Sequence, residues 1–376
     1  MGLFYIKFLL TDILFSLAAG LALVRFNKEG GSFKKFSNAE LLFYSLGIGP
    51  VLTVLVLYFL LLLFPGHGDL FYFICVFVVY LLLVVLGRKS FPVLRAELTA
   101  YVRAAAAHFR GNKRLKKVER IVFVLLLIVL LAVFLSYYLG NTLQTPLDGH
   151  DILTYGNIGK IYYQQKSINY SKNILDEKSG FYFPGSPKPS FSLLLTWEMM
   201  VNHLFRPGSS GGGQAPDSAF DKYFKSISAY YGLLLLALVF YWIYRGTGNK
   251  YVSLLGILVM LSGLRFFLVL INYHLDSYRV FFLLLSWVFL AYSIKRRDGF
   301  SLFLLGMFSG FAAFSHLIGA VVAGFNCLTL VIFLERPIKE RLWKTAVVCL
   351  LVLLFGGIHY LLEALSGAQW GFMTYF

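Results

Sequence analysis

Residues 41–87 read LLFYSLGIGPVLTVLVLYFLLLLFPGHGDLFYFICVFVVYLLLVVLG, and the only charged side chain among them is Asp69. A helix rises 1.5 Å per residue, so about 20 apolar residues cross the roughly 30 Å hydrocarbon core of a bilayer. The stretch is long enough for two such helices, with the polar sequence PGHGD between them at 65–69. It therefore predicts a pair of helices that crosses a membrane twice.

The whole chain shares this apolar character. Of its 376 residues, 59% are hydrophobic and 14% are charged, and the mean hydropathy is +0.73. Soluble domains have about 45–50% apolar and 25% charged residues, so a soluble fold is excluded. The formal net charge of +16 comes mostly from Lys and Arg in short loops between apolar runs. We attribute it to membrane topology and anionic lipid headgroups, and we predict no nucleic-acid partner.

Apolar runs long enough to span a bilayer recur along the chain. Residues 300–334 form one long apolar stretch, interrupted by Gly306, Gly310, Ser315 and His316, which predicts two short helices joined near His316. The sequence thus predicts an all-α polytopic membrane protein with about ten transmembrane helices. The eight clearest runs lie near 8–25, 41–64, 70–87, 121–139, 227–244, 251–271, 280–294 and 343–364.

The distribution of Lys and Arg predicts the orientation. Basic residues gather in alternate loops, whereas 65–69 carries none. Because cytoplasmic loops carry the excess of Lys and Arg, we expect the N-terminus, 65–69 and the large loop 140–226 on the extracytoplasmic side of the plasma or inner membrane. The first run contains Asp12 and shows no small-residue cleavage site, which favours an anchor helix over a removable signal. The basic loops lie at 25–40, 88–120, 245–250, 295–297 and 336–344.

The predicted organisation has three parts: N-terminal membrane helices (1–139), an extracytoplasmic catalytic loop (140–226) and C-terminal membrane helices (227–376). Within the first, 92–118 has the pattern of an amphipathic helix lying on anionic lipid. Within the second, 207–218 (PGSSGGGQAPDS) is a flexible linker. The cysteines show no metal-ligand or CxxC spacing and are predicted to be core residues: Cys75, Cys327 and Cys349.

Acidic residues cluster at the start of the loop 140–226. Asp148, His150 and Asp151 follow a membrane helix, and residues 151–165 have a helical pattern with Tyr155 on its apolar side. Asp151 could be a helix N-cap. Carboxylates at this position can also accept a proton from a hydroxyl or hold a divalent cation.

Further polar residues are expected at the same membrane surface. Asp276 lies between two apolar runs, and Arg265 lies inside a predicted span, where an ionisable residue suggests function. Alternatives remain open, because Arg279 could be a membrane-interface anchor and His359 with Glu363, spaced i, i+4, could be a helix-packing pair. Together these side chains predict a polar cleft, to which the sequence adds Glu198 and His316.

The chain resembles the C-type integral-membrane glycosyltransferases, the superfamily of dolichyl-phosphate-mannose and RgtA/B/C/D-like enzymes. Residues 146–160, PLDGHDILTYGNIGK, are similar to the relatives' Pro-Pro-Thr-Gly-Trp-Asp-Ala-Leu-x-Tyr-His segment and the lysine after it. Asp151, Tyr155 and Lys160 fall at matching positions, whereas His150 replaces the tryptophan and Gly156 the second histidine.

Three later segments resemble the same superfamily in the same order. SFSLLLTWEMM (190–200) places Glu198 at a glutamate of the relatives, and NYHLDSYRVFFLLLSWVFLAY (272–292) places Asp276 at their aspartate. LGMFSGFAAFSHLIGAVV (305–322) places His316 where the relatives have lysine, which would make a phosphate contact there depend on pH. The chain also ends one span later, at Phe376, whereas many relatives continue.

The resemblance implies transfer of a sugar from a polyprenyl-phosphate donor to an acceptor hydroxyl outside the membrane, in one inverting displacement. Asp151, helped by Asp148, would take the acceptor proton. Asp276, Glu198, Tyr155, His150 and His359 would shape the site. A divalent cation (Mg or Mn) could bind Asp148 and Asp151 but is not required. The leaving phosphate would be stabilised by cationic side chains: Arg265, Arg279, Lys160 and His316.

Two other classes remain open. A transporter or lipid flippase would also place charges within helices, although the chain shows no convincing internal repeat. A non-catalytic membrane paralogue is favoured by Gly156, His316 and the short C-terminus. The sugar and the acceptor, whether glycan, lipid or protein, are not specified by the sequence.

Overall fold

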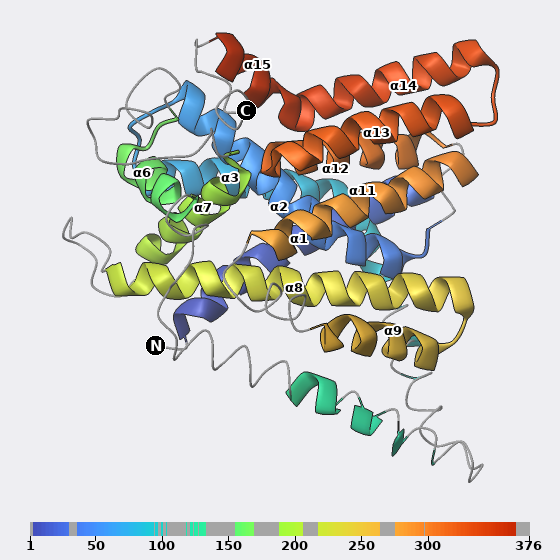
Figure 1. Ribbon diagram of the computed structural model, residues 1–376. Helices are drawn as coiled ribbons and strands as arrows, with labels where there is room; N and C mark the ends of the chain where they lie inside the picture. Colours follow the sequence, from blue (N-terminus) through green and yellow to red (C-terminus); the bar gives the residue numbers. More distant parts are fainter. Residues whose placement is uncertain are drawn as a thin grey trace.

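The computed structural model is helical throughout the residues that it describes (Figure 1). These residues are 3–29, 36–93, 155–168, 188–205, 217–263, 275–296 and 298–365, with shorter pieces between 95 and 132. The helices are α1 (Leu3–Glu29), α2 (Asn38–Leu63), α3 (Asp69–Gly87), α6 (Asn157–Gln165), α7 (Ser190–Leu204), α8 (Asp217–Thr247), α9 (Lys250–Ser262), α11 (Asp276–Arg296), α12 (Gly299–Ser315), α13 (Leu317–Phe333), α14 (Ile338–Val352) and α15 (Ile358–Leu365).

Four helices in the described part of the chain are long and apolar enough to cross a membrane: Glu40–Leu63, Asp69–Val93, Asp276–Arg296 and Ile338–Leu365. Shorter apolar helices accompany them at Lys250–Ser262, Gly299–Ser315 and Leu317–Phe333. The all-α prediction is confirmed for the described residues, and these helices indicate a membrane protein. The prediction of two helices joined near His316 is also confirmed, since His316 is extended between α12 and α13.

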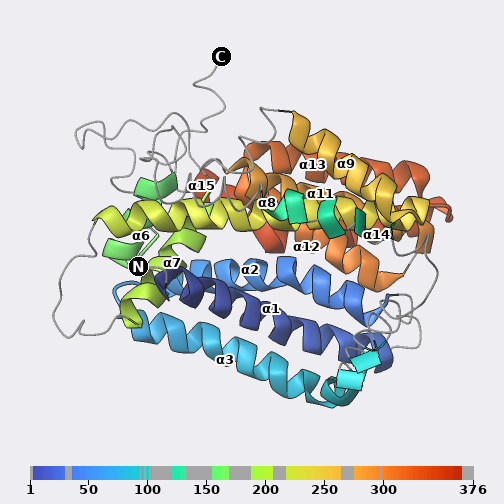
Figure 2. The ribbon, with the colours of Figure 1, turned by 90° about the horizontal axis from the view of Figure 1, so that it is seen from below.

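The long helices run roughly parallel or antiparallel to one another in two groups. α1 packs against α2 and α3, and Figure 2 shows these three side by side. α11, α12, α13 and α14 form the second group. Buried polar side chains join its helices, because the Asn326 amide donates to Ser286 Oγ at 3.2 Å and to Ser309 Oγ at 2.9 Å. Such interhelical hydrogen bonds satisfy polar groups that lipid could not.

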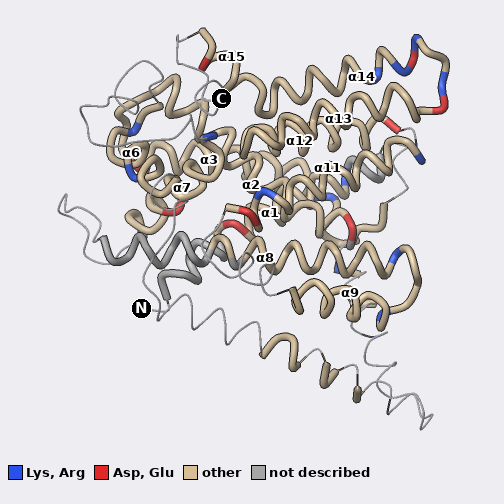
Figure 3. The backbone as a smooth tube through the Cα atoms, viewed as in Figure 1, with Lys and Arg blue, Asp and Glu red and all other residues tan. Residues whose placement is uncertain are grey.

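The two ends of the bundle differ in charge (Figure 3). At one end, here called the basic end, lie the turns between α8 and α9, α11 and α12, and α13 and α14, with Arg245, Lys250, Arg296, Arg336 and Lys344. At the other, the α6–α7 end, lie the α2–α3 loop, α6, α7, the start of α11, the α12–α13 junction and α15. The loops predicted to share a side from their Lys and Arg content therefore do share an end where the structure describes them.

A carboxylate network holds three helices together at the basic end. Glu40, in the first turn of α2, is buried and accepts hydrogen bonds from Tyr241 (2.6 Å) on α8 and Tyr292 (3.2 Å) on α11. It also pairs with Arg245, and its second oxygen accepts from the Ser37 backbone N–H at 2.7 Å, completing a capping box. One side chain thus caps α2 and joins α2 to α8 and α11.

Glu40→Ala is expected to lower the free energy of unfolding by about 1–3 kcal/mol, because it removes a cap and leaves buried hydroxyl donors without their acceptor. Arg245→Ala removes only the partly exposed partner and should cost less than about 1 kcal/mol. Thermal unfolding in detergent, followed by circular dichroism, measures both. Equal effects of the two substitutions would contradict the central role given to Glu40.

Other expectations fall partly or wholly outside the described residues. The linker 207–218 lies almost entirely outside them, and so does most of the amphipathic segment 92–118. The prediction that the cysteines are core residues is wrong for Cys349, which is exposed on α14, and Cys75 and Cys327 are only half-buried. Apolar helix faces of a membrane protein can meet lipid instead of a protein core, so hydropathy alone did not distinguish the two environments.

Candidate functional site

The segment 190–200, which forms most of α7, is in contact with the motif around Tyr155. Ser192 Oγ donates a hydrogen bond to the Tyr155 backbone carbonyl at 2.9 Å, and Thr196 Oγ1 donates to the Gly159 carbonyl at 3.0 Å. The crossing is close at Gly159, because a Cβ there would lie 3.0 Å from the Ser192 carbonyl oxygen. Two segments singled out by their resemblance to one superfamily are therefore packed directly together.

The other two segments meet the same part of α7. The Phe191 and Tyr278 rings lie 5.2 Å apart, which joins α7 to the segment 272–292. Ser190 Oγ donates to Ser315 Oγ at 2.9 Å, which joins α7 to the segment 305–322. The four segments, whose contacting residues stretch from Tyr155 to Ser315 in the sequence, thus converge on Ser190–Ser192. We call this meeting point the motif junction.

A buried ion pair lies next to the motif junction. Lys188, two residues before Ser190, places its Nζ 2.8 Å from Glu363 Oε2 on α15, and the two side chains are 11% and 6% exposed. The Lys188 ammonium also lies 4.4 Å from the centre of the Tyr360 ring. The ion pair and the cation–π contact both hold the Lys188 side chain in this position. Among the described residues, this brings a buried cation to the place where the four segments meet.

His359 belongs to the same group, which we call the Lys188 cluster (Lys188, His359, Tyr360 and Glu363). Its Nε2 lies 3.7 Å from Glu363 Oε2, so the expected i, i+4 pair is present. Glu363 also accepts a hydrogen bond from Lys188. The His359–Glu363 pair therefore belongs to a larger polar cluster and is not only a contact within α15. Sequence reasoning missed Lys188, whose only signal was its position in KPSF, directly before the second segment.

Asp276 and Arg279 form an ion pair within the first turn of α11. Their side chains are 30% and 20% exposed, and Tyr278 between them reaches the motif junction. A carboxylate at a helix N-terminus is favoured by the helix dipole, so the local sequence stabilises this arrangement. The contact with Asp276 fixes the position of the Arg279 side chain.

The other residues predicted for the site lie in different parts of the chain. Lys160 is partly exposed on α6. His316 caps α13, since its Nδ1 accepts from the Ile318 backbone N–H at 3.1 Å, which requires the neutral ring with its proton on Nε2. Asp148, His150, Asp151 and Arg265 lie outside the described residues, so their roles stay predictions.

Glu198 lies on α7, which is buried along most of its length. It is fully buried, its carboxyl oxygens have no hydrogen-bond partner among the described residues, and it lies close enough to Asp12 on α1 for the two carboxyl groups to interact. Asp12 is 2% exposed, and within the described part of the chain its Oδ2 has no partner either. Two acidic side chains are therefore buried between α1 and α7.

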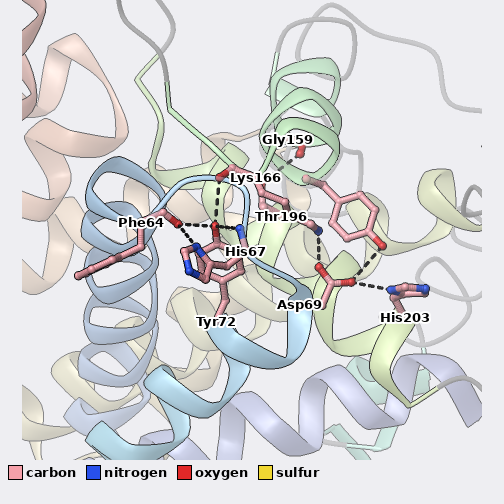
Figure 4. A network of polar contacts seen from close by, with 9 residues as sticks. Phe64, His67, Asp69, Tyr72, Gly159, Lys166, Thr196 and His203 are labelled. Carbon is pink, nitrogen blue, oxygen red and sulfur yellow. Dashed lines mark hydrogen bonds and ion pairs between the residues drawn. The ribbon is translucent and has the colours of Figure 1, made fainter. Parts of the chain in front are cut away.

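A second polar network ties the α2–α3 loop to α6 and α7 (Figure 4). Asp69 pairs with Lys166 and accepts from His203 Nδ1 at 2.6 Å and from the Tyr163 hydroxyl at 3.4 Å. Lys166 follows α6 in the left-handed conformation (φ 51°), and its carbonyl accepts from Gly66 N and the Tyr72 hydroxyl. Burial lowers the pKa of Lys166, and the hydrogen bond and charge of Asp69 oppose this shift. The network fixes α6, and with it Tyr155, against the bundle.

No group of three or more His, Cys, Asp or Glu side chains that could hold a metal ion occurs in the described part of the chain. The predicted ligands Asp148 and Asp151 lie outside that part. Comparisons of the chain with protein-family models, curated proteins and solved structures find no match. The functional interpretation therefore depends on the arrangement of side chains at the α6–α7 end.

Proposed function

We propose that the chain is a membrane-embedded glycosyltransferase that moves a sugar from a polyprenyl-phosphate donor to an acceptor hydroxyl. The observation that carries this proposal is the motif junction: four segments that resemble one superfamily, far apart in the sequence, touch one another around Ser190–Ser192. A site built from all four segments requires that they meet in this way.

The orientation follows from charge. With the basic end in the cytoplasm, the α6–α7 end faces the extracytoplasmic side, and the membrane crossings number about ten once the spans outside the described residues are included. A polyprenyl chain is soluble only in the bilayer, so a site at the bundle's end can meet both a lipid donor and a water-soluble acceptor. This arrangement accounts for an enzyme built almost entirely of apolar helices.

The proposed reaction is a single displacement at the anomeric carbon. Asp151, with Asp148 beside it, accepts the acceptor's hydroxyl proton as the new carbon–oxygen bond forms and the bond to the donor phosphate breaks. Attack opposite the leaving group inverts the anomeric configuration. Charge develops on the leaving phosphate, where Lys188, Arg279, Lys160 and Arg265 supply compensating positive charge. His316 is the weaker candidate, because while it caps α13 its ring is neutral and offers the phosphate only a hydrogen bond from Nε2.

Lys188 is the cation whose surroundings support a role at the phosphate most strongly. It is buried, so a charge contact there is poorly screened by water. Its partner Glu363 holds it in place until a phosphate binds, and His359 and Tyr360 complete the cluster. Asp276 would orient Arg279 through their ion pair.

The test is release of polyprenyl phosphate by the purified protein from a panel of polyprenyl-phosphate sugars. We expect turnover with at least one donor, and an inverted linkage in any product formed with an acceptor. Neither turnover nor donor binding across the panel would contradict the proposal and favour a non-catalytic paralogue or a transporter.

A transporter is the second candidate, and buried Asp12 and Glu198 favour it. Carboxyl groups inside a membrane bundle are costly and often bind protons or ions that drive transport. Asp12→Asn discriminates between the candidates in proteoliposomes, because a transporter would lose solute movement, whereas the proposed enzyme would keep its release of polyprenyl phosphate.

A further inference from the structure

Two thiols face each other between α13 and α14. Cys327 Sγ and Cys349 Sγ are 3.5 Å apart, which is direct contact between two sulfur atoms. They are 22 positions apart in the sequence and come from neighbouring antiparallel helices joined by the turn at 334–337. The third cysteine, Cys75, lies on α3 and is half-buried. The chain therefore has one pair of cysteines in contact, Cys327 and Cys349, and Cys75 can serve as a reference thiol in the same molecule.

The pair is suited to oxidation. A disulfide needs sulfur atoms about 2.05 Å apart on backbones already close to each other. The contact between the sulfurs shows that both side chains already point to the same place, so side-chain rotation and a small helix adjustment close the gap. If the two sulfur atoms were far apart, disulfide formation would instead need a rearrangement of the helix backbones.

The surroundings of the pair select the oxidant. Cys349 is exposed, Cys327 is half-buried, and exposed apolar side chains flank them, including Phe325, Leu328 and Leu350. Both cysteines lie about the middle of apolar helices, so this face of the bundle meets hydrocarbon. A lipid-soluble two-electron oxidant reaches such thiols, whereas glutathione disulfide in water does not.

We propose that Cys327 and Cys349 are a redox modification site that forms a reversible disulfide with a membrane quinone as oxidant. The two thiols lose two electrons and two protons, a sulfur–sulfur bond forms, and the quinone becomes a hydroquinone. The proposal does not depend on the glycosyltransferase reaction.

The disulfide would act on the candidate site through α14. Four residues after Cys349, α14 passes through a π-helical turn (Leu353–Gly357) into α15, which carries His359 and Glu363. α13 begins directly after His316. A covalent link between α13 and α14 therefore fixes the helix that positions the Lys188 cluster relative to the motif junction.

Counting free thiols tests the proposal. The protein is reconstituted in lipid nanodiscs, treated with a short-chain ubiquinone, denatured and labelled with a maleimide polymer that shifts the gel band once per thiol. Reduced protein has 3 cysteines and should carry three labels, and oxidised protein should retain one, on Cys75. Dithiothreitol should restore all three.

Three variants make the result specific. Cys327→Ser and Cys349→Ser should each keep both remaining thiols after the quinone, and Cys75→Ser should lose both of its thiols. Three labels on the quinone-treated wild type would overturn the proposal. Loss of label in Cys327→Ser, or a crosslinked dimer on a non-reducing gel, would overturn it as well, because either result assigns the bond to other partners.

Discussion

Lys188→Met is expected to lower the free energy of unfolding by about 3–5 kcal/mol and to abolish donor turnover. Methionine fills a similar volume but removes the lysine charge from the buried pair, and removing one partner of a buried ion pair is strongly destabilising. The substitution also removes the cation that we place at the leaving phosphate. Thermal unfolding and release of polyprenyl phosphate are the two measurements.

The double variant Lys188→Met/Glu363→Gln separates these two effects. It removes both charges, so most of the lost stability should return, since neutral replacements of a buried pair are often tolerated. Turnover should stay absent if Lys188 contacts the phosphate. A double variant that is stable and active would show that the ion pair is only structural.

Gly319→Ala is expected to destabilise the protein by about 2–4 kcal/mol through overpacking. A Cβ at Gly319 would lie 1.9 Å from the Ala312 carbonyl oxygen and 2.2 Å from its carbon, and backbone atoms cannot move aside without separating α12 from α13. Because Ser315 and His316 lie between these positions, the displacement would also disturb the motif junction.

Gly324→Ala is the matched control on the same helix. A Cβ there meets nothing within 4 Å, so replacing a mid-helix glycine by alanine should leave stability unchanged or raise it by up to about 1 kcal/mol. Unfolding temperatures in detergent compare the two variants. Equal destabilisation by both substitutions would contradict the close approach of α12 and α13 as the cause.

In the described part of the chain the apolar runs coincide with helices, because a long hydrophobic stretch is a strong signal in a membrane protein. The count of about ten membrane crossings stays a prediction. The sequence of the run 300–334 also indicated that it forms two helices, since Ser315 and His316 interrupt the apolar pattern at the junction between α12 and α13. Hydropathy did not reveal which face of a helix meets lipid, and for this reason Cys349 was misjudged.

The candidate site was only partly predictable. The segments that resemble the superfamily indicated Tyr155, Asp276 and His316. The i, i+4 spacing indicated the pair His359 and Glu363. The only local signal for Lys188 is its position just before the second segment, and its ion pair could not be predicted because the partner is 175 positions away. The Asp69 network was missed for the same reason, since Lys166 and His203 reach Asp69 only after α6 and α7 have packed.

The central claim is tested most directly by comparing wild type with Asp151→Asn for release of polyprenyl phosphate from the best donor of the panel. Asparagine keeps the shape of the side chain but cannot take a proton, so we expect turnover to fall at least 100-fold while the unfolding temperature and donor binding are unchanged. Turnover equal to wild type in a folded Asp151→Asn protein would contradict the proposed base and the site built around it.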